Sequence, residues 1–254
     1  MFNLDNLLKI ALTASNEACK AILKERKNLI TWQKADKSPI SSADIASNET
    51  INEILKSSDI EIISEESLPQ KRNLKALQNF WLVDPLDGTS GFIKGGNEFC
   101  VMISLIHQNR PILALIQNPT TNDIFYAHKD SKVYKNNEVL KPNEAEFKNN
   151  KFKALLSVNH LTKEDENFAK NHNLEPLNIS SGLKFCAILQ GFAGVYKRFE
   201  SLHTWDLVAG DFLVNQNGGF MGNFSQNKLF YNATNYQSEP FICVSRKEFL
   251  KDFL

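Results

Sequence analysis

The sequence is poor in cysteine, and its four cysteines lie far apart, so no pair has the C-x-x-C spacing of zinc or redox sites. Positive charge is not in excess, because Lys and Arg number 29, as do Asp and Glu, which gives no general attraction for nucleic acid polymers. No stretch is apolar enough to span a bilayer, and the N-terminus lacks a basic segment followed by an apolar run. We therefore expect buried thiols and a cytoplasmic protein, and we leave open a peripheral location at the inner membrane face.

Internal repeats, heptads and low-complexity tracts are also absent, which excludes solenoids and coiled coils. The 254 residues, 42% of them hydrophobic, have the composition of a globular protein. Apolar residues recur at three- and four-residue spacing in two early segments, which predicts helices over residues 4–27 and 42–55. Short apolar runs then predict strands of a mainly antiparallel sheet at residues 60–63, 80–83, 99–106, 111–116 and 124–127.

The second half has a different pattern. Residues 135–138 have the composition of a hairpin turn, and the polar segment 141–153 is a plausible boundary. After it, the sequence predicts strands at residues 154–158 and 194–198, and helices at residues 163–171, 183–190 and 207–217. We expect two subdomains, an α+β unit over residues 1–145 and an α/β unit over residues 146–254.

The most informative segment is residues 81–89, where an apolar run ends in Asp84, Pro85, Asp87, Gly88 and Thr89. Two carboxylates at the end of a buried strand suit a hard divalent cation. Asp, Pro and Gly also form ordinary surface turns, so this segment alone leaves the two interpretations open.

Further acidic clusters lie at the edges of predicted elements, at Glu65-Glu66, Asp206 and Asp211. Locally, Asp206 could cap a helix and no more, and Asp44 could complement a helix dipole. For Glu66 and Asp211 we expect solvated surface positions. His203, three residues before Asp206, is expected to pack beside the site and not to act in catalysis.

Three of these segments stand in the order of the signatures of the inositol monophosphatase superfamily: Ser64-Glu65-Glu66, Asp84-Pro85-Leu86-Asp87-Gly88-Thr89 and Trp205-Asp206-Leu207-Val208-Ala209-Gly210. The chain resembles these Mg²⁺-dependent, lithium-sensitive phosphatases over nearly its whole length. Within the superfamily it is most similar to bacterial 3'(2'),5'-bisphosphate nucleotidases of the CysQ type, through residues 34–39, 81–89, 92–94, 183–186 and 196–199. The resemblance implies an α/β (α+β) protein with the layered αβαβα fold of this superfamily.

The resemblance also implies a metal site. Glu65, Asp84 and the carbonyl of Leu86 would bind a first Mg²⁺, and Asp84, Asp87 and Asp206 a second, with a third ion left open. Few carboxylates and several waters are what Mg²⁺ prefers. The N-terminal subdomain would supply most of these ligands, and the C-terminal subdomain would supply Asp206 and substrate contacts.

The matching catalytic positions are Thr89 and Asp44, which would orient the attacking water, together with Glu65. Substrate phosphate would lie against the metals and the backbone of residues 87–89, near a helix N-terminus. The residues expected to contact substrate are Glu65, Leu86, Asp87, Gly88, Thr89, Lys184, Arg198 and Asp206. Lys184 and Arg198 are candidates for a second phosphate, with ordinary surface charge as the alternative.

The implied reaction is hydrolysis of the 3'-phosphate of adenosine 3',5'-bisphosphate to AMP and phosphate by metal-activated water, within sulfur metabolism. Inositol monophosphatases place a glutamate where this chain has Phe199, whereas the nucleotidases have Lys-Glu where it has Ser90-Gly91. An inositol or broad-specificity sugar phosphatase is therefore the enzyme alternative, and a non-catalytic phosphate- or metal-binding module is the alternative of another class. The expected partner is a small phosphate ester, and a homodimer is left open.

Overall fold

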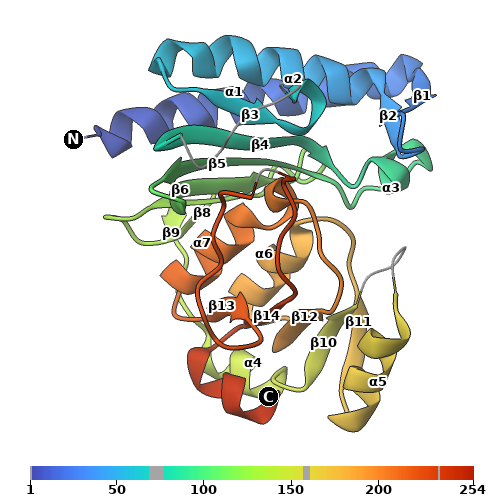
Figure 1. The fold of residues 1–254 in the computed structure, drawn as a ribbon, viewed down its shortest axis with the longest axis vertical. Helices are drawn as coiled ribbons and strands as arrows, with labels where there is room; N and C mark the ends of the chain where they lie inside the picture. The colour runs from blue at the N-terminus through green and yellow to red at the C-terminus, as the bar shows by residue number, and fades with distance from the viewer. Residues whose placement is uncertain (1, 69–76, 157–160, 234) are drawn as a thin grey trace.

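The computed structural model describes residues 2–68, 77–156, 161–233 and 235–254 and consists of five layers (Figure 1). Two helices cover one face of a seven-stranded sheet. Two further helices separate that sheet from a five-stranded sheet, whose outer face is covered by short helices. This is the expected layered αβαβα arrangement.

Strands follow one another without a helix over residues 100–139, whereas helices and strands alternate over residues 144–216. The α-helices are α1 (Leu4–Glu25), α2 (Ser42–Leu55), α3 (Thr89–Ile93), α4 (Glu144–Asn149), α5 (Lys163–Asn171), α6 (Leu183–Gln190) and α7 (Val208–Gln216). Short 3-10 helices are η1 (Arg26–Asn28), η2 (Lys56–Ser58), η3 (Glu65–Ser67), η5 (Thr204–Asp206) and η6 (Lys247–Asp252).

Over the described residues, the larger sheet has the order β3-β4-β5-β6-β7-β8-β9, with β3 and β4 parallel and the other neighbouring strands antiparallel. Its strands are β3 (Ile62–Ser64), β4 (Asn79–Asp87), β5 (Cys100–His107), β6 (Arg110–Gln117), β7 (Ile124–His128), β8 (Tyr134–Lys135) and β9 (Glu138–Val139). Both faces of this sheet are covered, which explains why residues 80–83 of β4 and 100–103 of β5 are apolar without alternation. Trp81 and Val83 face the core under α1 and α2, whereas Phe80 and Leu82 face the core around α6 and α7.

The smaller sheet has the order β11-β10-β12-β14-β13 and mixes parallel and antiparallel pairs. Its strands are β10 (Lys153–Leu156), β11 (Glu175–Asn178), β12 (Val195–Arg198), β13 (Phe220–Asn223) and β14 (Phe241–Val244). A separate hairpin pairs β1 (Thr31–Gln33) with β2 (Pro39–Ser41). The larger sheet ends at Val139 and the smaller begins at Lys153, while the proposed boundary at residue 145 falls inside α4; the division into two subdomains stays a prediction.

All four cysteines are free and buried, as expected. Within the described ranges, none of the helices combines the length and the hydropathy that crossing a membrane would require. The predicted end of the strand at residues 157–158 lies outside the described residues.

Candidate active site

Three carboxylates from separate parts of the chain meet at one end of the larger sheet. Asp84 lies in β4, Glu65 follows the parallel neighbour β3, and Asp206 ends η5 just before α7. One ligand oxygen from each of the three lies within 4.8 Å of the others. The parallel pairing of β3 and β4 explains why Glu65 and Asp84 lie together, because it directs the carboxyl ends of both strands to the same edge of the sheet.

Asp87 lies beside this cluster and has a different neighbour. Its Oδ2 accepts a hydrogen bond from the backbone N–H of Gly182, at the start of α6. The contact joins the turn after β4 to the segment that carries Lys184. Asp87 therefore links the acidic cluster to the C-terminal half of the chain.

The acidic groups raise one another's pKa values. Burial and the nearby carboxylates of Glu65, Asp87 and Asp206 hold the pKa of Asp84 well above its usual range. Burial and the carboxylates of Asp87 and Glu65 likewise hold the pKa of Asp206 well above its usual range. For Asp87, burial raises the pKa to about 6, although Lys184 opposes the shift. Buried like charges with few compensating cations are the electrostatic condition that a bound divalent cation would relieve.

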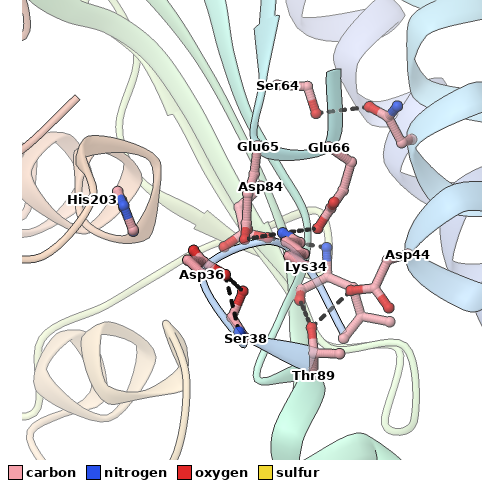
Figure 2. Close-up of polar contacts among 12 residues, drawn as sticks. Lys34, Asp36, Ser38, Asp44, Ser64, Glu65, Glu66, Asp84, Thr89 and His203 are labelled. Atoms are coloured by element: carbon pink, nitrogen blue, oxygen red, sulfur yellow. Dashed lines mark hydrogen bonds and ion pairs between the residues drawn. The ribbon is translucent and has the colours of Figure 1, made fainter. Parts of the chain in front are cut away.

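Lys34 is a cation of the site for which the sequence predicted no role. Its Nζ lies 2.7 Å from Glu65 and 2.6 Å from Glu66, as Figure 2 shows. Burial lowers its pKa, but the two glutamates outweigh that effect and raise it above its ordinary value. No local pattern could have shown this contact, because more than thirty residues separate the partners.

Thr89 and Asp44 are in contact, as the resemblance implies. The Thr89 hydroxyl lies 2.7 Å from Asp44 Oδ1 and 3.0 Å from the carbonyl of Leu86 (Figure 2). Asp44 also closes the capping box of α2 with Ser41, so its local role and its place in the site coexist. Burial raises the pKa of Asp44 above its ordinary value.

Gly88 makes the turn between β4 and α3 possible. Its φ of +97° lies in the left-handed region, and an added Cβ would come within 2.9 Å of the carbonyl of Glu98. A side chain there would be both strained and crowded. The backbone of residues 87–89 consequently stays close beside the acidic cluster.

A cleft of about 430 Å³ opens over the cluster, which is within the usual size range of small-molecule sites. Glu65, Leu86, Gly88 and the other predicted ligands line it, together with Lys184 and Arg198. Lys184 is 8% exposed and its Nζ donates to the carbonyl of Ser181. Arg198, only 2% exposed, pairs with Asp165 and Glu200, both at 3.3 Å. The structure thus brings every predicted site residue except Asp44 to the wall of this cleft, and Asp44 adjoins it through Thr89.

Two expectations about surface positions were wrong. The Glu66 side chain is 6% exposed and pairs with Lys34, and burial raises its pKa to about 7. Asp211 is fully buried and accepts from Arg110 at 2.6 Å and from the Tyr231 hydroxyl at 2.8 Å. In both cases the partner comes from a distant segment, which local sequence does not reveal.

Several residues that line the cleft were not anticipated, among them Asp36, Ser181, Glu200 and Gln237. Phe199, at the position where inositol monophosphatases place a glutamate, packs against Phe168 and Phe224 and not into the cleft. Glu200, next to it, does line the cleft, where its carboxylate pairs with Arg198.

Known proteins share both the sequence and the fold. The model of the inositol monophosphatase family matches residues 3–248. Curated relatives named 3'(2'),5'-bisphosphate nucleotidase CysQ include one from Shigella flexneri, 31% identical over 235 residues, which cover 90% of this chain and 93% of the relative. Another, from Buchnera aphidicola subsp. Acyrthosiphon pisum, is 33% identical over 241 residues, which cover 91% of this chain and 88% of the relative.

Solved structures of this family have the same fold as this chain. The chain is similar to CysQ from Bacteroides thetaiotaomicron, with a TM-score of 0.80, 26% identity and coverage of 97% and 99% of the two chains. It shares its fold with an inositol monophosphatase from Thermotoga maritima, with a TM-score of 0.76, 20% identity and coverage of 100% and 97%. With a family match over almost the whole sequence, relatives above 30% identity and a common fold, this chain belongs to the inositol monophosphatase family.

Proposed function

We propose that the chain is a Mg²⁺-dependent phosphomonoesterase that converts adenosine 3',5'-bisphosphate to AMP and phosphate. The observation that carries the proposal is that one cleft holds both the acidic cluster and two largely buried cations, Lys184 and Arg198. A substrate with two phosphates needs cationic groups beyond those that serve the reacting phosphate. The relatives named bisphosphate nucleotidases support the same substrate.

The family is metal dependent, and the donor set fits Mg²⁺ because it consists of carboxylates and a backbone carbonyl. We assign Glu65, Asp84 and the Leu86 carbonyl to one ion, and Asp84, Asp87 and Asp206 to another. Bound Mg²⁺ supplies positive charge that offsets the phosphate oxygens and lowers the pKa of water. The raised pKa values of Asp84 and Asp206 support this assignment, because these groups lack that charge in the protein alone.

Thr89 and Asp44 would orient the water. The Thr89 hydroxyl has one proton, and donation to Asp44 Oδ1 leaves the oxygen lone pairs to accept from a water beside the cluster. That water attacks phosphorus in line as the bond to the 3'-oxygen breaks; the water gives up one proton and the departing oxygen takes one up, so protons balance over the step. The backbone of Gly88 and Thr89 would hold the phosphate in place for this attack.

The test compares two substrates. Purified protein with Mg²⁺ should release phosphate from adenosine 3',5'-bisphosphate much faster than from inositol 1-phosphate, measured as kcat/KM. Asp84→Asn should abolish release, whereas Asp130→Asn should not, because the Asp130 side chain is 66% exposed and lies outside the cleft. Equal or reversed rates would favour an inositol or sugar phosphatase, and no release from any ester would favour a binding module.

A further inference from the structure

The imidazole of His203 forms a parallel stack with the indole of Trp205. The two ring centroids lie 4.8 Å apart and the planes meet at 10°. Trp205 is 3% exposed, so it is the buried member of the pair, whereas His203 is exposed and lines the cleft. Because Trp205 covers one face of the imidazole, the exposed surface belongs to the opposite face and the ring edge.

The position of this ring is fixed relative to the acidic cluster. The backbone N–H of His203 donates to Asp206 Oδ2 at 3.1 Å. On the other side, His203 forms a β-bridge with Gln237, and its neighbour Thr204 donates to the carbonyl of Tyr236 at 2.8 Å. These contacts hold the backbone of His203, and the stack on Trp205 holds its imidazole, so the ring is placed before any ligand binds, which lowers the entropic cost of binding.

No other aromatic side chain of the described cleft lining is comparably open. Phe185 and Tyr196 also line the cleft, but they are only 2% and 3% exposed. His203, like Asp206, comes from the C-terminal half of the chain, while Glu65, Asp84 and Thr89 come from the N-terminal half. Figure 2 shows His203 across from these N-terminal residues. The cleft thus offers an aromatic face within a mainly polar wall, close to the carboxylates that would serve a phosphate.

We propose that His203 is a specificity-determining residue that stacks on the base of a nucleotide substrate. The proposal rests on the proposed function for the phosphate end of that substrate. A nucleobase is planar and has a π-face, and an inositol ring has neither. Every base has such a face, so His203 would select nucleotides over sugar phosphates and discriminate weakly among bases.

The test uses two ligands that differ only in the base, AMP and ribose 5-phosphate. Both are titrated calorimetrically against the full chain with Mg²⁺. Wild-type protein should bind AMP roughly tenfold or more tightly than ribose 5-phosphate, as base–aromatic stacking generally contributes. His203→Ala should remove that difference without changing ribose 5-phosphate binding, and His203→Phe should keep it, because a planar ring remains.

His172→Ala is the matched control, since His172 also packs on an aromatic ring, at 4.6 Å from Phe168, but does not line the cleft. The His172→Ala protein should bind AMP with the same affinity as the wild type. Wild-type protein that binds AMP no more tightly than ribose 5-phosphate would overturn the proposal. The proposal would also be overturned if His203→Ala lowered the affinities for AMP and for ribose 5-phosphate by the same factor.

Hydrolysis assays separate this inference from the function it rests on. If AMP binding depends on His203 but adenosine 3',5'-bisphosphate is not hydrolysed faster than inositol 1-phosphate, the proposed function fails and the stacking role stands. If hydrolysis has the proposed selectivity and His203→Ala leaves AMP affinity unchanged, the function stands and the stacking role fails.

Discussion

Asp44 shows how one side chain can satisfy a local and a distant requirement at once. Its Oδ2 accepts from the backbone N–H and hydroxyl of Ser41, at 2.8 and 2.5 Å, at the start of α2. Its Oδ1 accepts from Thr89, 45 residues away in sequence, at 2.7 Å. The helix cap therefore fixes the carboxylate, and the fixed carboxylate fixes the Thr89 hydroxyl.

Thr89→Val tests this pair at the level of a single hydroxyl. Valine has nearly the same shape, so the fold should persist while the water loses its acceptor. We expect kcat to fall by about 10²- to 10⁴-fold, the usual effect of removing a group that assists proton transfer, with Mg²⁺ affinity unchanged in calorimetry. Thr89→Ser should retain most activity.

The control for this substitution is Thr50→Val on α2, whose hydroxyl bonds only to the Ala46 carbonyl among the contacts described. It should leave kcat unchanged. A Thr89→Val protein with near wild-type kcat would remove Thr89 from the catalytic residues.

The sequence predicted site residues correctly where an acidic side chain directly follows an apolar run. Glu65 directly follows β3, and Asp84 follows the apolar run of residues 80–83 inside β4, so a rule about where apolar runs end suffices to group them. The same reasoning failed for Glu66 and Asp211, because their counterions, Lys34 and Arg110, are supplied by tertiary structure. That Asp206 joins Asp84 followed from the family resemblance and not from spacing.

At the scale of elements, α7 must place Asp206 correctly, and a buried ionic network holds this helix. Asp211, one turn into α7, accepts from Arg110 of β6, from Tyr231 and from Asn215. Since the Asp211 carboxylate is fully buried, its removal leaves Arg110 without its counterion.

Asp211→Ala should therefore lower the free energy of unfolding by about 2–4 kcal/mol, measured by urea denaturation. The expected cost lies toward the low end because the Arg110 side chain is 24% exposed. Tyr231→Phe, which removes one hydrogen bond of the same network, should cost about 1 kcal/mol. Asp130→Ala is the exposed control and should change stability little; an equally small effect of Asp211→Ala would contradict this account.

The elements themselves were predicted unevenly. Helices with a clear apolar period, such as α1, α5 and α6, were found almost at their observed bounds. Residues 141–153 were expected to be a polar boundary, yet α4 forms there because one apolar side chain, Phe147, is buried in the outer core. Strands β11, β13 and β14 were not predicted, although β10 and β12, which are equally short, were. The residues of β11 and β13 contain proline, asparagine or glycine and form no apolar run of their own, so their neighbours in the sheet define them as strands.

At the scale of the whole molecule, the site lies where the two halves of the chain meet. The larger sheet provides Glu65, Asp84 and the turn to Thr89, and the segments after β12 and before α7 provide His203 and Asp206. Sequence patterns predicted helices and strands in both halves, and the layered arrangement followed from the family resemblance. Their juxtaposition depends on the packing of α7 against β6, which no local pattern contains.

This assembly of acids makes the stability of the protein depend on pH and on metal. Burial raises the pKa of Asp87 to about 6 and that of Glu66 to about 7, and it holds the pKa values of Asp84 and Asp206 well above their usual range. A carboxyl whose pKa is higher in the folded than in the unfolded state binds more protons when folded. Its contribution to stability is complete below the unfolded pKa, near 4, and is lost as pH rises through the folded value.

Without metal, the Tm should therefore fall as pH rises from about 4.5 to 7.5, over the range set by Asp87 and Glu66. Mg²⁺ binds the ionised carboxylates, so the increase in Tm that it produces should grow over the same range. Differential scanning calorimetry with EDTA or with Mg²⁺ measures both effects, and Asp84→Asn should reduce both, because it removes a buried charge and a ligand together. A metal-free protein whose Tm rises steadily over this range would contradict the proposed ionisation of the site.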